Sequence, residues 1–314
     1  MGTRWWIILV AVAVLAPALV FAGQTGDPVA VLTEIKVSQG EVRVKLASEA
    51  DWKAPLPLLS LRPGDQIRTT QNAKAVLMFT GGQGTVTVSA ANSPYTVQAQ
   101  SAAPGGKTTD LVASLGRMLS GKKKDLTYVP LTTRSVKQPP LLISPRDGKL
   151  LGPPVFEWGG SDRLRYTVRV RGPQGLLSEQ RELPRTPLSY PASAPSLAPG
   201  VPYTWELEAK DFPVQRGQFT LVVPAEGAEI QAALAALSGL AGYPQSTVRL
   251  MQAGYLFDQA LFTDARKELL VALAQDPEEP SLHLMLGHIY ERIGLKELAA
   301  EEFDEAEFLS SRKP

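Results

Sequence analysis

The stretch "AGYLFDQALFTDARKELLVALAQDP" (253–277) returns in altered form as "GHIYERIGLKELAAEEFDEAEFLS" (287–310). Matching positions recur at a constant spacing and keep their size, with small residues at 253/287 and 265/299 and larger ones at 256/290 and 269/303. A period of about 34 residues is typical of stacked pairs of α-helices, in which small residues allow close approach. Pro277 ends the first copy, as expected at a helix end. We predict a helical region over 226–314, with repeats at about 246–279 and 280–313.

This pattern resembles the tetratricopeptide (TPR) repeat family. The resemblance implies that the first helix of each repeat forms a concave face, which binds an extended peptide or a partner helix. The alternative is that the same positions pack against a β-domain of the same chain. The residues on which the resemblance places partner binding are Leu250, Gly254, Phe257, Asp258, Leu284, His288, Glu291 and Arg292.

The region from Val29 to about Gln100 has the alternation of β-strands. Apolar residues recur at every second position in "EIKVSQGEVRVKL" (34–46), around a turn at Gln39-Gly40. Within "LRPGDQIRTTQNAKAVLMF" (61–79), the pair Gly64-Asp65 is either a ligand-holding loop or a turn. A phosphate loop requires a following helix N-terminus, and strand-like residues follow here. The pattern therefore favours a structural turn.

The same region resembles the periplasmic FecR-like domain. Gly40 and Val42 fit a glycine-containing strand that precedes Trp52. The resemblance implies a β-domain outside the cytoplasm, over roughly 29–100. The best-known members relay a signal from an outer-membrane receptor to a cytoplasmic sigma factor. The residues that fit the segment after the tryptophan are Leu61, Gly64, Asp65, Ile67, Thr69 and Gly82.

Between these regions lie a linker and a second β-region. The linker (101–140) contains a short amphipathic helical pattern at Leu111, Val112, Leu115, Met118 and Leu119. The second β-region (141–224) has short alternating strands separated by Gly and Pro turns. This pattern predicts an immunoglobulin- or fibronectin-like β-sandwich.

The N-terminal stretch "MGTRWWIILVAVAVLAPALVFAGQ" (1–24) has one arginine, an apolar run and small residues at a cleavage site after Ala22. It is typical of a secretory signal peptide. We therefore expect residues 1–22 to be removed and the protein to be periplasmic or secreted. The alternative is that the run stays uncleaved as a membrane anchor.

The composition argues against several kinds of chemistry. The 314 residues include no cysteine, which excludes thiolate chemistry and disulfides. A net charge of +1 gives no global field for nucleic acid. The histidines, His283 and His288, lie five apart, a spacing that does not suit a zinc pair on one helix. Since no catalytic motif is present either, we expect a protein that is not an enzyme, without catalytic residues, cofactor or metal site.

Three functions remain open at this level. The first is an extracytoplasmic scaffold or adaptor of a bacterial envelope complex, which binds a protein partner through the helical repeats. The second is a module that binds peptidoglycan or another glycan, with Trp52, Trp158 and Trp205 as the aromatics for stacking on sugars. The third is a FecR-type signalling component held by the uncleaved anchor.

Overall fold

The computed structural model describes residues 27–99, 139–185 and 187–311. Along these residues the chain forms four β-sheets followed by five α-helices, which confirms the predicted β + α arrangement. The predicted export segment (1–22) and the predicted linker helix with Leu111 and Leu119 lie outside the described residues.

The N-terminal β-part (27–99) contains two sheets, with strand orders β3-β1-β5-β6 and β2-β4-β7. All its strand pairs are antiparallel, and Leu32, Ile67 and Phe79 are among the side chains that fill the core. The alternation seen in the sequence places one face of β2 and of β4 inside, whereas β1 and β5 are buried on both faces over most of their length. The elements are β1 (Ala30–Val37), β2 (Val42–Lys45), β3 (Ser60–Leu61), β4 (Gln66–Thr69), β5 (Ala73–Phe79), β6 (Thr85–Ser89), the 3₁₀-helix η1 (Ala90–Asn92) and β7 (Tyr95–Thr96).

The predicted turn at Gly64-Asp65 is confirmed. Gly64 has a φ of 94°, in the left-handed region that favours glycine. The buried Asp65 carboxylate accepts hydrogen bonds from the amides of Arg62 (2.7 Å) and Ala47 (2.8 Å). Asp65 thus satisfies the local backbone, and strand β4 follows directly.

The middle β-part (139–223) also has two sheets, of orders β13-β10-β8 and β12-β11-β14-β15-β9. Its core is aromatic: Phe156 lies 4.9 Å from Trp205 between ring centroids, and Tyr203 stacks on Phe219. Trp205 donates its indole N–H to the Pro145 carbonyl at 2.7 Å. The strands are β8 (Leu141–Ser144), β9 (Gly148–Leu150), β10 (Val155–Gly159), β11 (Tyr166–Gly172), β12 (Gly175–Leu183), β13 (Leu188–Ser189), β14 (Pro202–Ala209) and β15 (Gln215–Leu221).

The helical part (224–311) consists of α2 (Pro224–Ser238), α3 (Gln245–Asp258), α4 (Phe262–Gln275), α5 (Pro280–Arg292) and α6 (Lys296–Ser311).

The turns of the two successive helix pairs are equivalent. Ala260 and Gly294, which occupy the same position of the repeat, both have positive φ, at 60° and 78°. The next amide in each turn bonds back to the preceding helix, from Leu261 to the Leu256 carbonyl at 2.9 Å and from Leu295 to the Tyr290 carbonyl at 2.8 Å. Such a bond is characteristic of a helix that ends in the left-handed conformation.

Close approach within the second pair depends on a glycine, as the sequence predicts. A Cβ at Gly287 would lie 2.5 Å from ring carbons of Phe303 on α6. Ala253, its counterpart in the first pair, is fully buried, and so is Ala265. The small residues at these positions therefore allow the helices to touch.

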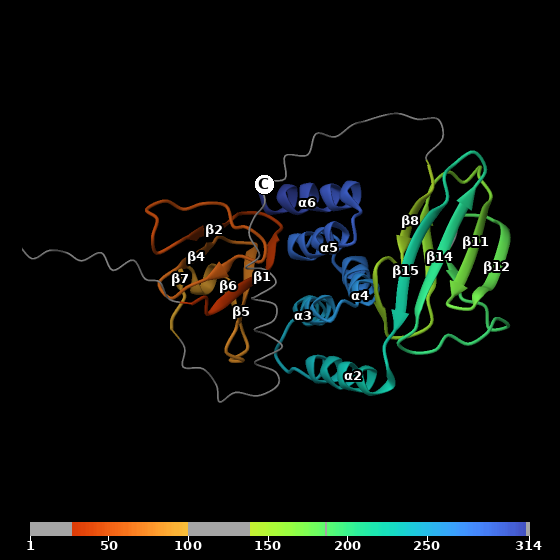
Figure 1. The fold of residues 1–314 in the computed structure, drawn as a ribbon. Coiled ribbons are helices and arrows are strands. Elements are labelled where there is room, and N and C mark those ends of the chain that lie inside the picture. The colour runs from red at the N-terminus through yellow and green to blue at the C-terminus, as the bar shows by residue number, and fades with distance from the viewer. Residues whose placement is uncertain (1–26, 100–138, 186, 312–314) are drawn as a thin grey trace, which may run out of the picture.

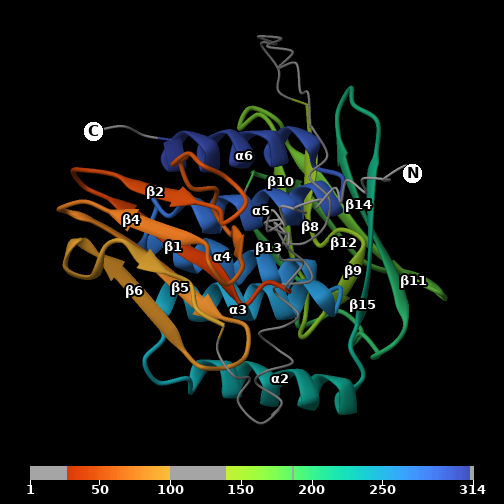
Figure 2. The ribbon, with the colours of Figure 1, turned by 90° about the vertical axis from the view of Figure 1, so that its left-hand side faces the viewer.

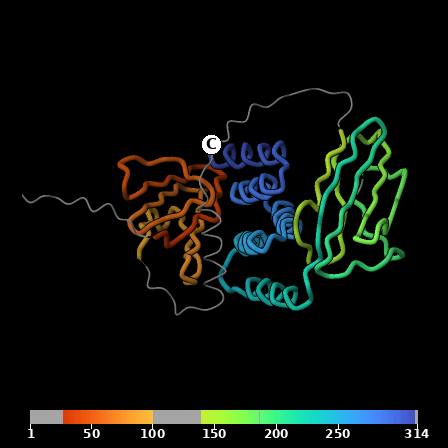
Figure 3. The backbone as a smooth tube through the Cα atoms, viewed as in Figure 1, coloured from red at the N-terminus to blue at the C-terminus, as the bar shows by residue number. Residues whose placement is uncertain are grey.

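The helical part (224–311) lies between the N-terminal β-part and the middle β-part. Figure 1 shows the helices between the N-terminal β-part on one side and the middle β-part on the other. Figure 2, turned by 90°, shows β1 and β5 in front of α3 and α5, and the tube in Figure 3 lets the reader follow the chain through this order. No helix among the described residues is long and apolar enough to cross a membrane.

Candidate functional site

The surface formed by the first helix of each pair is the candidate site, and we call it the α3–α5 face. Thr247, Leu250, Gly254 and Phe257 follow one another at intervals of three and four residues, so they lie along one side of α3. The corresponding side of α5 carries Ser281 and, in the same order, Leu284, His288 and Glu291. The two ends of this face have different surroundings.

At the N-terminal end of α3, the face is covered by the chain's own strand β1. Thr247 donates a hydrogen bond to Glu34 Oε1 at 2.9 Å, and Ser246 donates to the same oxygen at 2.6 Å. The hydroxyls of Thr33 and Thr247 lie 3.1 Å apart. Apolar side chains of the N-terminal β-part complete the contact: Val31, Leu58 and Met78 belong to the hydrophobic cluster of the helices.

At the start of α5, the side-chain carboxyl group of Glu279 makes the equivalent contact with β1. Both its oxygens lie 3.3 Å from the Ile35 amide nitrogen, and it also accepts from the Ser281 amide. Only 1% of Glu279 is exposed. Burial, together with the nearby Glu34 carboxylate, raises the pKa of Glu279 to about 8, against the opposing effect of the amides and of Lys36. Glu279 therefore carries a proton at neutral pH.

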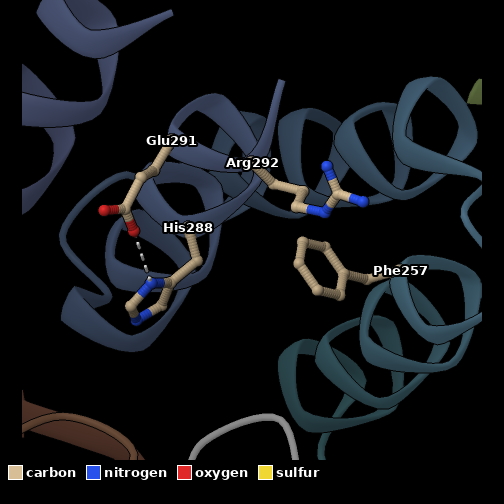
Figure 4. Close-up of a pocket in the computed structure, with 4 residues that line it drawn as sticks. All are labelled: Phe257, His288, Glu291 and Arg292. Atoms are coloured by element: carbon tan, nitrogen blue, oxygen red, sulfur yellow. Dashed lines mark ion pairs between the residues drawn. The ribbon is translucent and has the colours of Figure 1, made fainter. Parts of the chain in front are cut away.

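At the other end of the α3–α5 face, a pocket is open to solvent. It has a volume of about 320 Å³ and is lined by Phe257 from α3 and by His288, Glu291 and Arg292 from α5. Figure 4 shows Arg292 beside the Phe257 ring, while Glu291 extends to the other side, above His288. The pocket therefore joins an apolar wall to a cationic group.

The polar groups of this pocket contact neighbouring side chains. The Arg292 guanidinium lies 5.0 Å from the ring centroid of Phe262, which in turn packs edge-on against Phe257. Arg292 has no ion pair among the described residues. Burial lowers the pKa of His288 below its ordinary value, although Glu291, 3.8 Å away, opposes the shift. His288 is therefore uncharged at neutral pH and can donate or accept a hydrogen bond.

The residues predicted for partner binding fall into three groups. Phe257, His288, Glu291 and Arg292 come together in the pocket. Asp258 is exposed next to them on α3. The structure places Leu250 within the core with 1% of its surface exposed, and Leu284 and Gly254 also pack inward. Leu250 thus contributes to stability rather than to an open surface.

The opposite side of the helical part is occupied by the middle β-part. Arg266 on α4 is buried and bonds Glu157 of β10 at 2.8 Å and the Tyr290 hydroxyl at 3.1 Å. The Lys149 amide donates to the Ala260 carbonyl at 3.0 Å. The helical part therefore makes hydrogen bonds to both β-parts.

The tryptophans considered for sugar stacking are divided between core and surface. Trp158 and Trp205 are buried in the core of the middle β-part. Trp52 is partly exposed, and the Arg68 guanidinium lies 4.9 Å from its ring centroid. Only Trp52 of these three is thus accessible to a ligand.

The two histidines have different surroundings. His283 contacts Glu302 at 2.7 Å through Nδ1 and the Pro277 carbonyl at 2.9 Å through Nε2. Burial opposes its protonation, but these contacts outweigh burial and raise the pKa of His283. Its ring therefore ties α5 to α6 and to the preceding turn. Among the described residues, no group of three or more acidic or histidine side chains could hold a metal ion.

Comparison of the chain with protein-family models finds no match, and comparison with curated proteins finds none either. The functional argument thus depends on the residues and their geometry.

Sequence reasoning missed the polar junction at β1. Glu34 and Thr33 interrupt an apolar strand, and Glu279 directly precedes Pro280 at a helix start. A buried glutamate in a strand is a signal of a partner, since charged side chains are rarely buried alone. The partner could not be named, because Ile35 and Glu279 are 244 residues apart.

Proposed function

We propose that the protein is a non-enzymatic scaffold or adaptor of a bacterial envelope complex, placed in the periplasm or secreted. The open pocket at the end of the α3–α5 face carries this proposal, because it is the part of the predicted binding face that the described residues leave uncovered. Export is supported by the N-terminal sequence pattern alone.

We interpret the three parts as a FecR-like β-domain (29–100), an immunoglobulin- or fibronectin-like β-sandwich (141–224) and a pair of TPR-type hairpins (246–279 and 280–313). The TPR interpretation is supported by the equivalent turns at Ala260 and Gly294 and by the close approach of Gly287 to Phe303. Two sheets around one aromatic core, antiparallel except for the β15–β9 pair, support the sandwich. The confirmed turn at Gly64-Asp65 supports the FecR-like pattern.

The chemistry of the pocket defines the partner segment that it suits. Phe257 offers an apolar surface, and Arg292 offers a guanidinium that has no ion pair among the described side chains. A cation in such a place favours a carboxylate, which it can bind through two hydrogen bonds. The segment should therefore carry an apolar side chain close to an acidic residue or a chain terminus. Uncharged His288 adds a hydrogen-bonding group.

Crosslinking in cells tests this proposal. Phe257 is replaced by the photoreactive residue p-benzoylphenylalanine in the full chain, and the same replacement at Phe308 serves as the control. Phe308 is an exposed aromatic residue on α6, 58% accessible and away from the pocket. We expect a specific protein to be captured from position 257, with the crosslink mapping to a segment of the stated chemistry.

A charge reversal completes the test. Arg292→Glu should abolish the capture, because the carboxylate at position 292 would repel the carboxylate of the partner segment. Lys296→Glu, which reverses an exposed cation at the start of α6, should leave it unchanged. Equal capture from positions 257 and 308, or capture that survives Arg292→Glu, would contradict the assignment of the pocket.

A further inference from the structure

The outer face of strands β2 and β4 carries two arginines directly opposite each other. Arg43 and Arg68 are partners in the antiparallel register of this pair. Both contact the same carboxylate: Arg43 Nε lies 2.9 Å from Glu41 Oε2, and Arg68 Nη2 lies 3.5 Å from Glu41 Oε1. The two guanidiniums are therefore close together, with one negative charge between them. Like charges directly opposite in a sheet are destabilising.

The middle β-part shows how this protein arranges arginines that have a structural role. On the outer face of β11 and β14, Arg169 stands opposite Glu206 in the register and is ion-paired with Glu179 at 2.8 Å and with Glu208. Arg216 stands opposite Glu206 from the other side. Each arginine of that face therefore meets carboxylates. The face of β2 and β4 lacks this compensation.

Other side chains increase the positive charge and hold it in place. Lys45 follows Arg43 on the same side of β2 and has no ion pair among the described residues. The Trp52 ring supports the Arg68 guanidinium at 4.9 Å, which fixes one cation of the pair. The side chains of Arg43 and Arg68 remain 27% and 43% exposed, so their outer N–H groups are accessible.

We propose that this face binds an anionic polysaccharide, with a carboxylate or phosphate oxyanion held between Arg43 and Arg68. An oxyanion there would relieve the repulsion that Glu41 only partly offsets, through hydrogen bonds from two guanidiniums. Lys45 would attract the next charge along the chain, and the exposed part of Trp52 would contact a sugar ring. The site is separate from the pocket at Phe257, so it stands or falls independently of the proposed scaffold function.

Binding to defined saccharides tests the proposal. Titration calorimetry of the full chain uses oligogalacturonate as a carboxylate probe, a phosphomannan oligosaccharide as a phosphate probe, and dextran as an uncharged control. We expect binding to at least one anionic probe, weakening as salt is added, and none to dextran. Which anionic probe binds more tightly identifies the oxyanion.

Variants connect the binding to these residues. Arg43→Gln and Arg68→Gln should each lower affinity roughly tenfold, and the double variant should abolish binding. The matched control is Arg171→Gln, which removes a similarly exposed strand arginine that is paired with Glu206 at 3.2 Å. It should bind as the unaltered protein does. Binding that the double variant retains, or no binding of either anionic probe by the unaltered chain, overturns the proposal.

Thermal unfolding gives a readout that does not depend on calorimetry. The anionic probe should raise the Tm of the unaltered protein but not that of the double variant. Without ligand, Arg43→Gln should leave the Tm unchanged or raise it, because it removes a like-charge pair. A marked fall in Tm would indicate that Arg43 is present for stability, and would count against a binding role.

Discussion

At the scale of single residues, Ala260 occupies a position that suits glycine better. Its φ is 60°, whereas the equivalent turn of the next repeat uses Gly294 at 78°. A side chain in the left-handed region costs ~1–2 kcal/mol, because its Cβ crowds the neighbouring carbonyl. The alanine is tolerated because its backbone is bonded on both sides: its amide donates to the Phe257 carbonyl, and its carbonyl accepts from the Lys149 amide of the middle β-part.

Ala260→Gly should therefore stabilise the protein. We expect the free energy of unfolding to rise by about 0.5–1 kcal/mol, since relief of the backbone outweighs the larger entropy of the unfolded chain. Chemical denaturation measures this change. Gly294→Ala is the matched control and should lose a comparable amount. If Ala260→Gly proves less stable than the unaltered chain, strain at this turn is not significant.

At the scale of elements, the pairing of α5 with α6 shapes the pocket. Gly287 allows Phe303 to lie against α5, and the Phe303 ring in turn packs edge-on against His288, with 5.1 Å between ring centroids. The His288 side chain, which lines the pocket, is thus positioned by a ring of the next helix. A change within the hairpin should for this reason alter the pocket.

Gly287→Ala tests this coupling. The added methyl group would lie 2.5 Å from the Phe303 ring, so the ring must move. We expect a loss of ~1–2 kcal/mol in the free energy of unfolding, as is usual for overpacking, together with weaker capture of the partner at position 257. Gly239→Ala is the control, since its Cβ would lie 3.5 Å or more from its neighbours. If Gly287→Ala leaves the free energy of unfolding unchanged, the Phe303 ring moves aside at no cost and the coupling is absent.

At the scale of the whole molecule, the sequence predicts the local elements, but it does not predict which distant segments pack against each other. The constant spacing of the repeat predicted the helix pairs, and helical periodicity brought Phe257, His288 and Arg292 to one pocket. Periodicity also placed Leu250 on that face, but it cannot tell which end another part of the chain covers. The contact between β1 and the helices joins segments that are far apart in the sequence, by 244 residues for Ile35 and Glu279. At the N-terminal end of the face, that contact is the internal packing that the sequence had left as an alternative.

The junction between β1 and the helices should respond to pH through Glu279. Its pKa in the folded protein is about 8, above the ordinary value of 4.5. The folded state therefore binds a proton that the unfolded state has released over the range between these values. The resulting stability is complete below pH ~4.5 and is lost as pH rises through 8. Above that pH, a charged Glu279 would be buried beside Glu34, with Lys36 and the amides of Ile35 and Ser281 as the groups that favour its charge.

Glu279→Gln removes the titrating group and keeps an oxygen for the Ile35 amide. We expect the variant to be more stable than the unaltered chain at pH 9, by roughly 1–3 kcal/mol, and the gain to shrink toward pH 5. Denaturation across this range measures the difference between the two proteins, in which the titration of groups that do not act on Glu279, such as His283 at the next turn, cancels. Hydrogen exchange at Ile35 should also slow in Glu279→Gln at pH 9, because the junction opens less often. An exchange rate equal to that of the unaltered chain would mean that Glu279 does not control the docking of the N-terminal β-part.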